Sequence, residues 1–133
     1  MNLSAIEDQL RDLHGTLYNL VGLHRKLLDL VRAEKEVLLS ADSKKIQEIT
    51  HSKEVLLHSI LQVERARQGV VEHLSIKMRV PKDELRIANL IKIIEPKYVK
   101  HAEKLHSIWQ TLGILIQRIQ EQNNENKKVV ESS

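Results

Sequence analysis

The chain has 133 residues and a net charge of +3, and it is 41% hydrophobic, 29% charged and only 2% aromatic, with no cysteine. This length supports one domain with its own core, and the lack of cysteine excludes disulfides, zinc ribbons and thiol catalysis. The mild charge and the scarcity of aromatic side chains argue against a nucleic-acid partner. We therefore expect a single domain over residues 1–133, with a core of leucine, isoleucine and valine.

The first predicted helix covers about residues 5–39. Its apolar residues recur with spacings of three and four, from Leu3 to Leu38, so one face of the helix must be buried along a narrow seam. Ser4 and Glu7 have the spacing of a capping box, which predicts that the helix begins at Ser4. Gly15 lies inside this helix, where glycine lowers helix stability relative to alanine. A closely packed neighbour is one explanation for a glycine at this position.

The second predicted helix covers about residues 43–77, with Asp42 as its N-cap. So short a connection to the first helix predicts an antiparallel hairpin. Charged residues interrupt the two seams at Glu34, Lys53 and Arg67. Either their long stems cover apolar surface while the charges reach solvent, or they are partly buried beside acidic partners that fix the helix register. The sequence leaves both interpretations open.

A short helix over about residues 82–94 should follow, because Pro81 suits the start of a helix and Pro96 ends or kinks one. Its apolar stripe is formed by Leu85, Ala88, Ile91 and Ile94. The fourth helix then covers about residues 97–131. The predicted fold is all-α: an elongated antiparallel helical bundle or coiled-coil hairpin with three long helices and one short helix, in which an open seam allows a homo-oligomer.

The fourth helix carries the most suggestive polar residues of any seam. Its stripe includes Tyr98, Ala102, Leu105 and Trp109, and it continues to Asn123, Asn126 and Val130. A seam asparagine commonly specifies alignment, and two on one face offer amides to a partner's backbone. The alternative is a seam that becomes exposed where the helix outruns its neighbours. The pattern is still apolar at Val130, so we expect a frayed end or native residues beyond Ser133.

Additional apolar residues, namely Ile108, Ile114 and Leu115, widen this stripe beyond what one neighbour needs. A bundle core uses stripes of this width. The alternative is an apolar face that receives an amphipathic helix of another protein.

No constellation for catalysis, metal binding or a cofactor is evident. His101 and His106 do not have the spacing of a metalloprotease motif, and no carboxylates cluster with them. His51 invites comparison with histidine phosphotransfer domains, but Lys53 stands one position early and the glycine of that signature is absent. We therefore do not expect an enzyme. A glycine-rich phosphate loop is also missing, and no N-terminal signal or roughly 20-residue apolar run is present, which predicts a cytoplasmic protein.

The chain resembles the FlgN family of flagellar export chaperones. The matching residues are Glu34 before the turn at Ala41-Asp42, Lys53 followed by Leu56-Leu57, Arg67 after Val63-Glu64, the short segment Asp83-Glu84-Leu85, and Asn123-Asn-Glu-Asn126. The resemblance implies a cytoplasmic chaperone that binds the C-terminal helical segments of the hook–filament junction proteins FlgK and FlgL and delivers them to the type III export gate.

The family's cargo contact lies on the C-terminal helix. Carried over to this chain, the implied partner-binding residues are Leu112, Leu115, Ile116, Ile119, Asn123, Asn126 and Val130. The family usually continues apolar beyond the paired asparagines, whereas this chain stops at Ser133, so part of that surface is expected to lie beyond it. The runner-up function is a helical scaffold or adaptor without a role in secretion, followed by a phosphotransfer domain.

Overall fold

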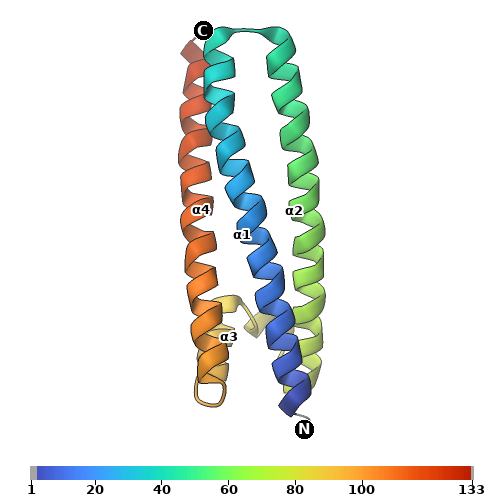
Figure 1. The fold of residues 1–133 in the computed structure, drawn as a ribbon. Helices are drawn as coiled ribbons and strands as arrows, with labels where there is room; N and C mark the ends of the chain where they lie inside the picture. The colour runs from blue at the N-terminus through green and yellow to red at the C-terminus, as the bar shows by residue number, and fades with distance from the viewer. Residues whose placement is uncertain (1–2, 133) are drawn as a thin grey trace.

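The computed structural model describes residues 3–132, and over this range it is all-helical, without a strand (Figure 1). The elements are α1 (Leu3–Ser40), α2 (Ser43–Met78), the 3-10 turn η1 (Lys82–Glu84), α3 (Ile87–Ile94) and α4 (Val99–Ser132). The all-α prediction is thus confirmed for the described residues. Within the same range, no helix combines the length and the apolar character that crossing a bilayer requires.

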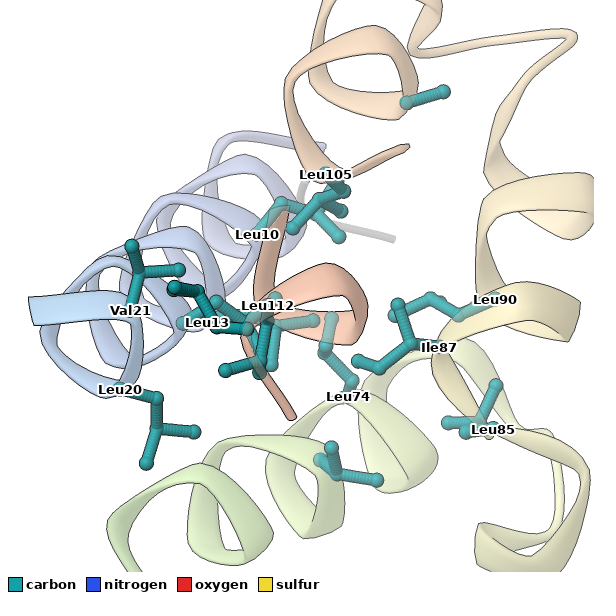
Figure 2. Close-up of a cluster of buried hydrophobic side chains, with 14 of the residues drawn as sticks. Leu10, Leu13, Leu20, Val21, Leu74, Leu85, Ile87, Leu90, Leu105 and Leu112 are labelled. Atoms are coloured by element: carbon teal, nitrogen blue, oxygen red, sulfur yellow. The ribbon is translucent and has the colours of Figure 1, made fainter. Parts of the chain in front are cut away.

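The arrangement is centred on α1, which packs against both α2 and α4, whereas α2 and α4 do not pack along each other (Figure 1). α3 packs on α4, and η1 contacts α2. In Figure 2, α1 and α3 lie on opposite sides of the buried cluster. We call the end that contains α3 the α3 end, and the end with the α1–α2 connection the hairpin end.

Because α3 is short, one corner of the bundle, which lies opposite α1 and between α2 and α4, is incomplete. α1, α2 and α4 have 38, 36 and 34 residues, whereas α3 has 8. At 1.5 Å per residue, α3 covers about 12 Å of helices that are about 50 Å long. The corner opposite α1 is therefore filled by α3 only at the α3 end.

The connections have clear local causes. The Oδ1 of Asp42 accepts hydrogen bonds from the backbone N–H groups of Lys44 and Lys45 at 3.1 and 3.2 Å, which confirms the predicted cap. Ala41 lies in the left-handed region at φ 55° and turns the chain into an antiparallel hairpin. The prediction at the first helix is wrong, because Leu3 is already helical and Ser4 therefore lies inside α1 rather than at its N-cap.

The core lies mainly along α1 and at the α3 end. α2 fully buries only Val71 and Leu74, and the rest of its predicted seam is half-buried. α2 has α1 as its main neighbour along most of its length, so its seam gains full cover only beside η1 and α3. On α1, by contrast, cover comes from both flanking helices, and the buried residues are Ile6, Leu10, Leu13, Leu17, Leu20, Val21, Leu27, Leu28 and Val31.

The short third helix differs from its prediction. The segment 82–94 is divided into η1 and α3, because Arg86 is extended (φ −62°, ψ 147°) and begins a new helix. This division shifts the helical phase, so that Leu85, Ile87, Leu90 and Ile94 are buried, whereas Ala88 is exposed and Ile91 is half-buried. η1 is tied to α2 by an ion pair of 2.8 Å between Lys82 and Glu72, which lowers the pKa of Glu72.

The glycine in α1 has no packing role. Gly15 is exposed, and a Cβ added there would meet nothing within 4 Å. The explanation by a closely packed neighbour is therefore wrong.

Candidate partner-binding surface

The predicted partner-binding residues divide into two groups in the structure. Four of them are buried in the monomer, with exposed fractions of 3% for Leu112, 7% for Leu115, 6% for Ile119 and 4% for Asn126. The other three are accessible: Ile116 is half-buried, Asn123 is exposed, and Val130 is 56% exposed. The first group holds α4 in the core, and only the second is open to a partner while α4 stays packed on α1.

A polar cluster explains why an asparagine is buried on α4. The Nδ2 of Asn126 donates to the carbonyl oxygen of Val31 at 2.8 Å and to Oε1 of Glu34 at 3.0 Å. The Nζ of Lys53 donates to both carboxylate oxygens of Glu34, at 3.2 and 3.0 Å. Glu34 of α1 therefore joins α2 and α4. The side chains of Glu34 and Lys53 are only 12% and 25% exposed, so the pair is well shielded from water.

These contacts decide between the two interpretations of the charged seam residues. Lys53 is partly buried beside an acidic partner on another helix, so it fixes the register of α1 and α2. Arg67 instead pairs with Glu64 of its own helix at 3.0 Å and links no helices. Asn126 belongs to the same register device, and Gln122 donates to its Oδ1 at 3.0 Å. Asn126 can meet a partner only if α4 separates from α1.

One stripe of α4 faces the incomplete corner. Ala102, Trp109, Ile116, Asn123 and Val130 are spaced by seven residues and so share a helix face. At the α3 end, Ala102 and Trp109 line a hollow together with Ala88 and Ile91 of α3. Ala102 is buried, whereas Trp109 is 38% exposed and so is not the buried seam residue that its spacing predicts. α3 does not extend past Trp109, and of the next two residues of the stripe Ile116 is half-buried and Asn123 is exposed.

A matching stripe on α2 faces the same corner. Gln68 and Val71 line a hollow with residues of η1, which shows that this side of α2 is directed toward η1 and α3. Leu61 precedes Gln68 by seven residues, and Leu57 precedes Val71 by fourteen, so both leucines continue that side toward the hairpin end. There they are 48% (Leu57) and 47% (Leu61) exposed.

These two leucines were missed by sequence analysis as site residues. The available signal was the pair of apolar doublets Leu56-Leu57 and Ile60-Leu61, in which the second member stands beside the seam rather than on it. Such doublets widen the apolar face of a helix beyond what one neighbour covers.

At the hairpin end the corner closes into a hollow of about 340 Å³ where three helices meet. Its apolar lining includes Leu38 of α1, Ile46 of α2, and Val129 and Val130 of α4. We define the open corner as the space between α2 and α4 beyond α3, bordered by Leu57, Leu61, Ile116, Asn123 and Val130.

Other chemistry finds little support in the described part of the chain. Among residues 3–132, no three His, Cys, Asp or Glu side chains are close enough together to hold a metal ion. His51 is an exposed residue on α2. The arrangement supports the binding of a helix or an extended segment.

The comparison with known proteins agrees with the resemblance noted from the sequence. A family model described as "FlgN protein" matches residues 1–133, which is the whole chain. No curated protein and no solved structure matches the chain.

Proposed function

The chain belongs to the FlgN family of flagellar export chaperones, and from this we propose that it binds the C-terminal helical segments of hook–filament junction proteins of the FlgK and FlgL type. It acts in the cytoplasm, keeps these segments from aggregating or assembling early, and delivers them to the type III export gate. It performs no chemistry on them.

The observation that carries this proposal is the open corner. α3 fills the position between α2 and α4 only at the α3 end. Beyond α3, the faces of α2 and α4 keep apolar side chains half-exposed. From Trp109 to Val130, α4 extends about 30 Å at 1.5 Å per residue, which matches an amphipathic helix of about six turns. A cargo helix of that length would complete the corner along the line of α3.

The bordering residues suit such a helix. Leu57 and Leu61 on one side and Ile116 on the other would cover its apolar seam. Fully burying a leucine is worth about 1.5–3 kcal/mol, so covering the half-exposed ones gains about half of that each. Asn123 offers an exposed amide that donates to and accepts from polar groups along the edge of the cargo. The gain is modest for each residue, which suits a complex that must be released.

The buried members of the predicted surface take an indirect part in this proposal. Leu112, Leu115, Ile119 and Asn126 fix α4 on α1, and this holds Ile116, Asn123 and Val130 in line along the corner. If the cargo instead replaces α1 as the neighbour of α4, the buried residues become direct contacts. The open corner requires no such displacement.

Two alternatives predict other behaviour. A scaffold or adaptor without a role in secretion would not recognise these C-terminal segments. A phosphotransfer domain would label His51, which is not among the residues that border the open corner. Incubation with a phosphodonor and an assay for acid-labile phosphate on His51 tests the latter, and efficient labelling would displace the chaperone proposal.

Binding is tested by the fluorescence of Trp109, the only tryptophan of the chain, which lies where α3 ends. Titration with a tryptophan-free C-terminal segment of FlgK or FlgL should give a saturable shift of the emission to shorter wavelength, because a docked helix removes water from the indole. Calorimetry should give one segment per chain. If neither method detects binding of either segment, the chain is not a chaperone for these proteins.

A further inference from the structure

A second surface lies at the α3 end, between α1 and α4. A hollow of about 360 Å³ is lined by Arg11 and His14 of α1 and by His101 and Lys104 of α4, with Leu10 and Leu105 beside them. Lys104 is two residues from Ala102, which places the two on opposite sides of α4. The hollow is therefore distinct from the open corner.

Of the two permanent positive charges that line this hollow, that of Arg11 is paired and that of Lys104 is not. Arg11 is engaged by acids of its own helix, with 2.9 Å to Asp8 and 3.8 Å to Glu7. Within the described residues, His14, His101 and Lys104 take part in no ion pair. All residues that line the hollow are basic, histidine or leucine, and none is acidic.

The pKa of His14 reflects its position in this hollow. Partial burial, and then the positive charge of Lys104, lower the pKa of His14. The other polar groups at the hollow are Arg11 of the same helix, and His101 and Lys104 of α4, and none of them is acidic. The ring of Tyr98 meets that of His101 edge-on, with centroids 6.3 Å apart, and orients this second imidazole.

We propose that this hollow docks an acidic segment of a protein partner, in which a carboxylate lies between His14 and Lys104. The small size of the hollow favours such a segment over a nucleic acid, which needs a longer basic track and stacking aromatics. Because this surface is separate from the open corner, the chain could hold cargo and an acidic partner at the same time.

A peptide titration tests the proposal. The probe is a short acetylated peptide rich in glutamate, and its binding is followed by amide NMR of the full chain. We expect the largest shifts at His14 and Lys104, and tighter binding at about pH 5.5 than at about pH 7.5, because a bound carboxylate favours the protonated form of His14. The pKa of His14 should rise in the complex.

Matched variants separate local docking from general attraction. Lys104→Glu should weaken peptide binding on the order of tenfold, since it replaces an attraction with a repulsion. Lys104→Arg should retain binding. Lys45→Glu makes the same charge change at the exposed start of α2 and should have little effect.

Three results would overturn the proposal. One is equal binding of a peptide with glutamine in place of glutamate, and another is a loss with Lys45→Glu as large as with Lys104→Glu. The third is tighter binding of a single-stranded oligonucleotide than of the acidic peptide. None of these results bears on cargo binding in the open corner, which Trp109 reports separately.

Discussion

Asn126→Asp should lower the free energy of unfolding by about 3 kcal/mol. The new carboxylate would stand at the position from which Nδ2 now donates to the carbonyl oxygen of Val31 and to Glu34. Both acceptors would lose a donor and face a negative charge at a site that is 4% exposed. Since Glu34 also accepts from Lys53, the change should weaken the junction of all three long helices.

Asn123→Asp is the matched control, because it makes the same chemical change three residues away at an exposed position. We expect its effect to stay within about 0.5 kcal/mol, as for most surface substitutions. Urea unfolding followed by circular dichroism measures both variants. Equal stabilities would mean that the polar cluster does not hold α4 on α1.

The double variant Leu57→Glu/Leu61→Glu should reduce the affinity for the FlgK or FlgL segment on the order of 100-fold. Each substitution removes apolar area that the cargo would cover, and each places a carboxylate where the complex excludes water. Together these losses amount to roughly 3 kcal/mol. Both leucines are about half-exposed, at 48% and 47%, so the free chain should keep its fold.

Val55→Glu provides the control for this variant. Val55 is also a large apolar residue of α2, 54% exposed, but it is two residues from Leu57 and so lies on the opposite side of the helix. Calorimetry should give wild-type affinity for Val55→Glu. A comparable loss for both variants would indicate a general effect on α2 rather than a contact with cargo.

The helices and their ends were largely predictable, because their causes are local. The spacing of apolar residues identified the helical segments, and Asp42 signalled the start of α2 through its side-chain cap. The prediction of buried residues was wrong in the short helix, where one residue sets which face of the helix is turned toward the core. Arg86 is extended and begins α3 anew, so the buried residues of the short helix are Ile87 and Leu90 rather than Ala88 and Ile91.

The candidate site was less predictable, because it depends on which neighbours are present. Asn123 and Asn126 follow the same spacing rule, yet one is exposed and the other is buried against α1. Trp109 and Leu112 likewise share a stripe, but α3 ends beside Trp109 and leaves it 38% exposed. No pattern within a single helix specifies how far its neighbours extend. The exposure of Leu57 and Leu61 follows from the shortness of α3.

Site-specific photo-cross-linking tests most directly whether cargo occupies the open corner. A photoreactive residue at Leu61 on α2 or at Ile116 on α4 should cross-link to the C-terminal segment of full-length FlgK or FlgL, since the two positions border the corner from opposite sides. The same residue at Val55, on the far side of α2, should give no product. Cross-links from Val55 without any from Leu61 and Ile116 would contradict the account.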